Sequence, residues 1–480
     1  MVDLNIRALT SNFSIALAVQ FLSFAVSAAT SFLVPKALSV DHFGYWQLFL
    51  FYVGYIGFLQ FGLNDGVYLR FGGRTRESID HQSITQQFAV SIISQILVAS
   101  MLGLSSFLLV NDLDRKAVII SIAVMTPLCN CAWYLGYVFQ AINETKLYSY
   151  SVLISRVAFL LPLVVLLVLR IDQYGFYVAA YVIGQVLSLV YCLAKSKGLL
   201  TRLKSGDMRR AAFDSCASIK VGIKLLVATL ASSLMLGCSR FVIDAIWDIS
   251  TFGLVSIAFA VVSFFLTSMA QASMVLFPVM RQASKEEYSG WLKIIRNFII
   301  IILPAAYPLY FALSLLLLWW LPDYAYALEL AALLMPVCVF DGIFQTVHLT
   351  YFKVARKEKH LMRLNIGAVA IVALLVCLTG YGLHDLRLVV LSPTLVIVLR
   401  AFVADRMMAG AIGGFSHQKL LSCVALTVVF LMAKMLLSDP MAGFAVVTSY
   451  IVFLYINRHS VFDVIKRWRY HMAEGDGSGD

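Results

Sequence analysis

Long runs of almost entirely apolar residues constrain this chain more than any other feature of its sequence. Two examples are Ile294–Leu321 and Gly367–Gly382. A helix of about 20 apolar residues spans the hydrocarbon core of a bilayer, which is about 30 Å thick. Only 13% of the 480 residues are charged, whereas soluble domains carry about 25%. Because β-barrel strands are short and alternate with polar positions, we predict an all-α polytopic membrane protein.

About fourteen transmembrane helices are predicted, with short connections between them. The predicted spans are 12–37, 44–69, 83–109, 116–141, 147–170, 174–194, 220–246, 251–279, 292–320, 325–352, 362–382, 386–410, 418–438 and 441–457. The N-terminal segment 1–11 precedes a long apolar run with no small-residue cleavage pattern, so we expect this run to be retained as a span. The longest internal polar stretch separates six spans from the next eight. The predicted parts are an N-terminal lobe (1–195), a basic linker (196–219), a C-terminal lobe (220–410), two extra helices (411–458) and a tail (459–480).

The basic residues predict the orientation of these spans. Most of the 37 lysine and arginine residues fall in segments on the same side as the N-terminus. Cytoplasmic loops carry such an excess, so both termini, the linker and the tail are expected in the cytoplasm. The net charge of +11 is explained by attraction to anionic membrane lipids. No nucleic-acid partner is predicted.

A weak internal repeat relates the two lobes. Without gaps, Phe43-Gly44 aligns with Phe252-Gly253, and a second match pairs Phe139 with Phe352. Six helices are an even number, so both lobes have the same orientation and are parallel repeats. Such a body has one natural cleft, between the lobes, and can rock to open it to either side. This geometry is typical of a transporter.

Small and polar residues form stripes along spans 1, 2, 7 and 8 at helical spacing. The residues proposed to face the cleft and bind substrate are Gln20, Asp65, Arg240, Asp244 and Gln271. The same spacing also occurs on faces where membrane helices pack, which is the alternative.

Charges inside spans are the sharper signal, because each costs about 2.5–3.5 kcal/mol at a span centre on insertion scales. Arg240 and Asp244 form either a local ion pair or a cationic substrate contact in which Asp244 orients the guanidinium. Arg156 lies near the middle of span 5 and is a second candidate for anion binding. Arginine suits this role because its planar fork can hold two oxygen atoms at once.

Asp341 and His348 lie in span 10 and are candidates for proton or ion coupling, because both can titrate when buried. Asp341 could instead pair with Arg156 or Arg400. Cys129 and Cys131 have no second pair and no nearby histidine, so no metal site is predicted.

Two segments resemble the polysaccharide-transporter flippases of the multidrug/oligosaccharidyl-lipid/polysaccharide exporter superfamily. They are Asp41–Trp46, which reads DHFGYW, and Phe61–Gly73, which reads FGLNDGVYLRFGG. The resemblance implies a flippase of the bacterial cytoplasmic membrane that moves undecaprenyl-diphosphate-linked oligosaccharide units by alternating access for surface polysaccharide biosynthesis. It also implies cationic cavity residues on the diphosphate and sugars. The implied partners are this lipid-linked oligosaccharide, membrane lipids and polysaccharide polymerase machinery.

Two other functions are the alternatives to this one. An ion-coupled multidrug or small-molecule antiporter of the same superfamily would favour acidic cavity residues for cationic drugs. A membrane-embedded glycan polymerase needs a catalytic constellation, usually on a sizeable external loop, and the external connections here are short. The sequence contains no Walker loop, dinucleotide fingerprint or H-E-x-x-H motif. We therefore expect a transporter, not an enzyme, without a cofactor.

Overall fold

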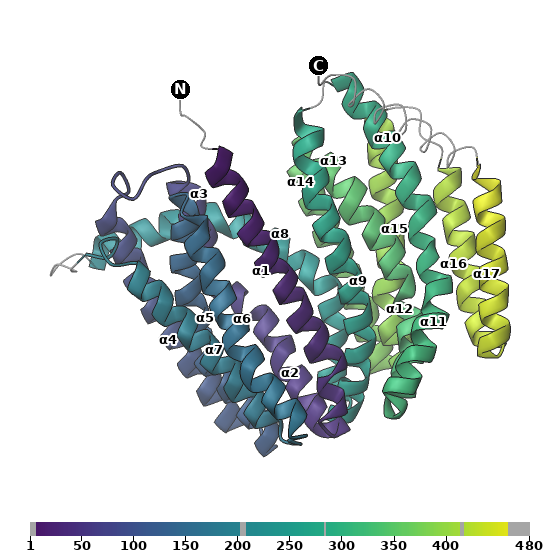
Figure 1. Cartoon of the computed structure of the whole chain (residues 1–480), viewed down its shortest axis with the longest axis horizontal. Helices are drawn as coiled ribbons and strands as arrows, with labels where there is room; N and C mark the ends of the chain where they lie inside the picture. Colours follow the sequence, from purple (N-terminus) through teal and green to yellow (C-terminus); the bar gives the residue numbers. More distant parts are fainter. Residues whose placement is uncertain (1–5, 202–207, 283–284, 413–416, 459–480) are drawn as a thin grey trace. The chain divides into compact units, whose positions relative to one another are not determined.

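The computed structural model describes the backbone of residues 6–201, 208–282, 285–412 and 417–458, with most of their side chains. This part of the chain is helical and contains no β-strand (Figure 1). Thirteen of its helices are long and apolar enough to cross a membrane, or up to fourteen if one bent pair counts as a single span. The prediction of an all-α, multi-pass membrane protein is confirmed.

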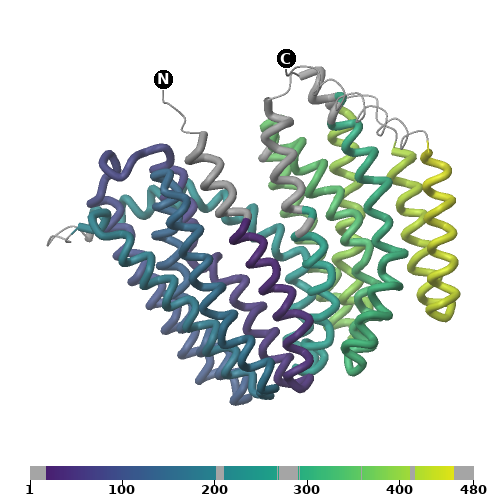
Figure 2. The backbone as a smooth tube through the Cα atoms, viewed as in Figure 1, coloured from purple at the N-terminus to yellow at the C-terminus, as the bar shows by residue number. Residues whose placement is uncertain are grey.

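The chain divides into two compact units, which Figure 2 traces from the purple N-terminal helix to the yellow C-terminal one. Unit 1 consists of Met1–Leu230 and Asp248–Gly253. Its helices are α1 (Ile6–Phe32), η1 (Val34–Lys36), α2 (Val40–Ile56), η2 (Gly57–Gln60), α3 (Leu63–Phe71), α4 (His81–Leu109), α5 (Leu113–Ala141), α6 (Thr145–Val168), α7 (Tyr174–Lys195) and the first part of α8 (Met208–Ile246).

Unit 2 consists of Ala231–Trp247 and Leu254–Asp480. Its helices are the second part of α8, most of α9 (Ile249–Gln282), α10 (Lys285–Ile302), η3 (Leu303–Ala305), α11 (Ala306–Trp320), η4 (Pro322–Tyr324), α12 (Ala325–Ile343), η5 (Phe344–His348), α13 (Leu349–Val354), α14 (Glu358–Cys377), η6 (Leu378–Gly382), α15 (Leu386–Ile412), α16 (Gln418–Leu436) and α17 (Asp439–Ile456). The last two pack side by side (Figure 1).

The second predicted span, 44–69, is broken and not continuous. The segments Val40–Gln60 and Leu63–Phe71 meet at an angle of 54°. Between them Phe61 and Gly62 have φ values of 54° and 89°. A left-handed backbone cannot continue a right-handed helix, and glycine adopts it without a steric penalty. The break therefore turns α3 away from the direction of α2.

Small residues let α3 pack closely against the first part of α8. A Cβ atom at Gly66 would overlap the carbonyl oxygen of Ser218, and one at Gly222 would overlap that of Gly62. Arg70 of α3 donates to the Asp214 carbonyl and to Ser218 Oγ, both at 2.7 Å. Helix α8 begins at Met208, inside the stretch expected to be a linker, and its first part belongs to unit 1. The lobe boundaries expected from sequence stay a prediction.

This close packing makes Gly222 sensitive to substitution. We expect Gly222→Ala to lower the free energy of unfolding by about 1–3 kcal/mol, because the added methyl group meets backbone that cannot move aside. The measurement is the thermal unfolding midpoint of the purified full chain. Gly367→Ala on α14 is the control, since a Cβ atom there meets no other residue within 4 Å. Equal midpoints for the two variants would contradict the expectation.

Residues that the internal repeat makes equivalent lie together in unit 1. Ser250 donates a hydrogen bond to Asp41, its counterpart in the repeat alignment. A Cβ atom at Gly253 would lie 3.0 Å from Cα of Gly44, again its counterpart. The first turn of α9 thus contacts the first turn of α2 within unit 1.

In unit 2 a π-helical turn, η5, lies between α12 and α13. Such turns are rare and occur frequently at functional sites. This one carries Gln345 and His348, and it lies beside α15, whose Ala404 and Met408 share a buried apolar cluster with Phe344 and Val347. The turn therefore presents polar side chains next to a tightly packed core.

Candidate functional site

A polar cavity of about 350 Å³ lies among five helices of unit 1: α1, α2, α5, α6 and α7. Its polar lining consists of Gln20, Ser23, Ser151, Ser155, Gln185 and Ser188, together with Arg156. Its aromatic lining consists of Trp133, Tyr148, Phe159 and Tyr181. Two residues predicted to bind substrate, Gln20 and Arg156, are thus brought together by the fold.

Packing between α6 and α7 fixes the aromatic side of the cavity. A Cβ atom at Gly184 would lie 2.6 Å from the Ser155 carbonyl oxygen, so glycine is needed for the two helices to approach. Phe159 stacks on Trp46 with ring centroids 6.0 Å apart and meets Tyr181 edge-on at 5.2 Å. Aromatic rings in these arrangements contribute about 0.5–1.5 kcal/mol each beyond the area that they bury. These contacts hold Phe159 and Tyr181 in place along this wall.

Arg156 supplies the charge of the cavity. Its Nε atom is buried and has no hydrogen-bond partner among the described residues. In the same part of the chain, no carboxylate pairs with the guanidinium group. A buried cation inside a membrane normally has a partner, because the desolvation cost is otherwise uncompensated. The cavity is therefore suited to an anionic ligand.

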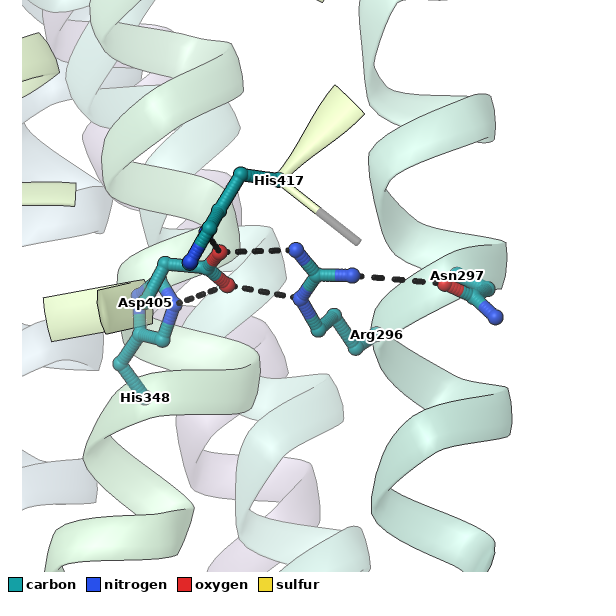
Figure 3. A network of polar contacts seen from close by, with 5 residues as sticks. All are labelled: Arg296, Asn297, His348, Asp405 and His417. Carbon is teal, nitrogen blue, oxygen red and sulfur yellow. Dashed lines mark hydrogen bonds and ion pairs between the residues drawn. The ribbon is translucent and has the colours of Figure 1, made fainter. Parts of the chain in front are cut away.

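A second polar cluster lies in unit 2 around Asp405 of α15, toward which three side chains point (Figure 3). Arg296 of α10 donates through Nε at 2.7 Å and through a terminal nitrogen at 2.8 Å. His348 Nε2 lies 3.4 Å from Oδ1, and His417 Nδ1 lies 2.9 Å from Oδ2. Arg296, His348 and Asp405 are at most 1% exposed, whereas the His417 side chain is 42% exposed. One buried carboxylate thus joins four elements.

The candidate coupling residue Asp341 belongs to a neighbouring ion pair. Arg400 donates to Asp341, and Gln345 Nε2 donates to the same carboxylate at 2.7 Å. The Arg400 guanidinium also lies over the Phe344 ring, 3.7 Å from its centroid. The sequence offers Arg156 and Arg400 as partners of Asp341, and in the structure Arg400 is the one that pairs with it. His348 bonds Asp405, so the two candidate coupling residues occupy separate pairs.

The other predicted substrate contacts lie elsewhere. Arg240 on α8 donates to Ser256 Oγ of α9 at 2.8 Å and lies over the Phe259 ring at 6.0 Å. Asp244, one turn later, is buried. Asp65 on α3 is half-buried and accepts a hydrogen bond from Gln60 at 2.9 Å. The side chain of Gln271 lies outside the described residues.

Sequence reasoning missed most of the cavity and the centre of the Asp405 cluster. Ser151 and Ser155 lie one turn apart on α6 and line the cavity, and this spacing was a usable signal. Gln185 and Ser188 show a similar pattern on α7. Nothing in the sequence links Arg296 of α10, Asp405 of α15 and His417, the residue just before α16.

These features define a multi-pass helical membrane protein with polar groups buried inside its helical units. A family model described as "Polysaccharide biosynthesis protein" matches residues 9–284, which is more than half of the chain. The chain therefore belongs to the polysaccharide biosynthesis protein family. A comparison with curated protein sequences finds no match.

Solved structures of transporters share the fold. The lipid II flippase MurJ, in an inward closed conformation, matches with a TM-score of 0.68 over 93% of this chain and 99% of that chain. An inward-facing multidrug resistance MATE family transporter of the MOP superfamily matches with a TM-score of 0.52 over 83% of this chain and 98% of that one. Both are 11% identical to this chain, so these similarities show the fold.

Proposed function

We propose that the protein is a flippase that moves undecaprenyl-diphosphate-linked oligosaccharide units across the bacterial cytoplasmic membrane by alternating access. In this proposal both termini are cytoplasmic, and the units pass to polysaccharide polymerase machinery on the outer side. The protein transports its substrate without altering it chemically.

The observation that carries this proposal is the polar cavity of unit 1 with the Arg156 cation inside it. Hydroxyl and amide groups buried at the depth of a membrane are costly unless they meet a polar partner, which a ligand can supply. A glycan supplies many hydrogen-bonding groups, and a lipid-linked glycan adds anionic ones. Membership of a polysaccharide biosynthesis family and a fold shared with a lipid II flippase both support this class of substrate.

The test of this function is deletion of the gene in its native cell. We expect loss of the surface glycan and accumulation of the lipid-linked oligosaccharide on the cytoplasmic side, both reversed by the intact gene. The competing function, an ion-coupled multidrug antiporter, predicts a different result: sensitivity to cationic drugs rises while the surface glycan is unchanged. That second result would overturn the proposal.

Within the proposal, Arg240 contacts the diphosphate of the lipid, and Ser256 and Asp244 position its guanidinium. We expect Arg240→Ala to lower glycan export about tenfold or more, because charge-assisted hydrogen bonds contribute about 1.5–3 kcal/mol. Arg240→Lys keeps the charge and is expected to retain part of the activity, since it loses only the planar fork. Export is measured as surface glycan per cell at matched membrane levels. Unchanged export by Arg240→Ala would rule out this role.

The energy source in the proposal is an ion gradient or the membrane potential. Asp341 and His348 are the candidate coupling residues, and the pairing of each with another charged side chain supports this role. Protonation would change the balance of charge in each pair, and the pairs join separate helices.

A further inference from the structure

The cavity of unit 1 has a charge that limits what it can bind. Arg156 is the only charged side chain among the described residues that line it. Its counterion must balance one positive charge, because excess charge in a low-dielectric site is unfavourable. A diphosphate carries more than one negative charge near neutral pH, whereas a carboxylate carries one. The charge of the cavity therefore favours a carboxylate.

The geometry of Arg156 agrees with this choice. Arg156 lines the cavity, and its Nε atom is buried and unpartnered among the described residues. Nε and a terminal nitrogen together form one edge of the guanidinium plane. That edge matches the two oxygen atoms of a carboxylate with two parallel hydrogen bonds.

The remaining lining suits a sugar ring. The amides of Gln20 and Gln185 can both donate and accept hydrogen bonds. The Ser155 hydroxyl donates to the Val152 carbonyl at 2.8 Å and can accept a hydrogen bond from a ligand. Tyr148 and Tyr181 offer apolar ring faces with a polar end, which fits a ring whose C–H face is apolar and whose rim carries hydroxyl groups. A volume of about 350 Å³ lies at the lower end of the range of about 300–1,000 Å³ for ligand sites. It holds part of a glycan and not a whole lipid-linked oligosaccharide.

We propose that this cavity binds an acidic sugar of the transported glycan, with the sugar carboxylate on the Arg156 guanidinium and the ring hydroxyls on the surrounding amides and serines. The proposal rests on the flippase function and narrows its substrate class to oligosaccharides that contain a uronic acid. It also assigns a specificity-determining role to Arg156: the residue selects acidic over neutral sugars.

The experiment measures binding to the purified full-length protein in lipid nanodiscs. The probes are methyl β-glucuronide, its methyl ester, methyl β-glucoside and pyrophosphate, and the readout is saturation-transfer NMR with titration. We expect the glucuronide to bind at least tenfold more tightly than the ester and the glucoside. Arg156→Gln is expected to abolish this preference, and Arg156→Lys to retain part of it. Gln185→Leu is expected to weaken glucuronide binding about fivefold while the preference for the acid remains.

Arg170→Gln is the matched control, since Arg170 is an exposed arginine just after the same helix, α6, and outside the cavity. Equal binding of the glucuronide and the glucoside to the unaltered protein would overturn the proposal, and this comparison needs no variant to fold. Arg156-dependent binding of pyrophosphate without preference for the glucuronide would also overturn it, because the site would then hold the lipid diphosphate. In both cases glycan export in cells is measured in parallel. Export that still depends on the gene shows that the flippase function stands although the acidic-sugar site fails.

Discussion

Replacing Asp405 with alanine is expected to lower the free energy of unfolding by about 3–5 kcal/mol, the range for breaking a buried ion pair from one side. The carboxylate accepts two hydrogen bonds from Arg296, which is 1% exposed. Without it the buried guanidinium loses the carboxylate that accepts these two hydrogen bonds. The same substitution also removes the partner of His348 and of His417.

The measurement is the thermal unfolding midpoint of the purified protein, together with its level in the membrane. Asp405→Asn keeps the shape and loses the charge, so an intermediate loss is expected. Glu329→Ala is the control: Glu329 pairs with Arg387 at 3.3 Å, but the two side chains are 55% and 63% exposed. Exposed pairs contribute about 0–1 kcal/mol. An unfolding midpoint for Asp405→Ala as high as that of the unaltered protein would show that Arg296 does not depend on this carboxylate.

The ion pair between Arg400 and Asp341 gives the second large effect. Removing either charge alone, in Arg400→Leu or Asp341→Leu, leaves the other uncompensated and is expected to cost about 3 kcal/mol or more. Removing both charges in the double variant is expected to recover most of that loss. Replacing a buried pair with apolar residues of similar volume is often neutral.

A double-mutant cycle on the unfolding midpoint tests this expectation. Residues in direct contact show interaction energies of about 0.5–3 kcal/mol, and a pair this buried is expected near the top of that range. In the Arg400→Leu variant a second interaction is lost as well, because the Arg400 guanidinium also makes a cation–π contact with the Phe344 ring. Asp341→Leu keeps that contact and serves as the cleaner arm. Strictly additive losses would mean that the two side chains do not stabilise each other.

The number and position of the membrane spans could be predicted from sequence, because a bilayer requires long apolar helices and little else. The expected span 292–320 and the helical stretch Leu292–Trp320 coincide. The break at Phe61 and Gly62 could not be predicted, because their left-handed backbone depends on how α3 meets α8. Hydropathy also concealed the start of α8 at Met208, since its first turns carry polar residues such as Asp214, whose carboxylate accepts a hydrogen bond from Ser83 Oγ.

The candidate site was only partly accessible from the sequence. Arg156 and Gln20 could be selected because charged and amide side chains are rare and costly inside spans. The pairing of charges could not be read in the same way, because it depends on which helices are neighbours. Asp405 and Arg296 come from separate helices, and the structure buries both.

The division of α8 between the units affects how the molecule can be taken apart. Unit 1 takes residues 1–230 and returns for 248–253, so no single cut in the polypeptide yields both units whole. The polar stretch 196–219 is the obvious place to split the gene in two. A break there would separate Gly62 and Gly66 from the part of α8 that packs against them. The N-terminal fragment made this way lacks part of unit 1. The two units therefore have to be made as one polypeptide if each is to keep all of its segments.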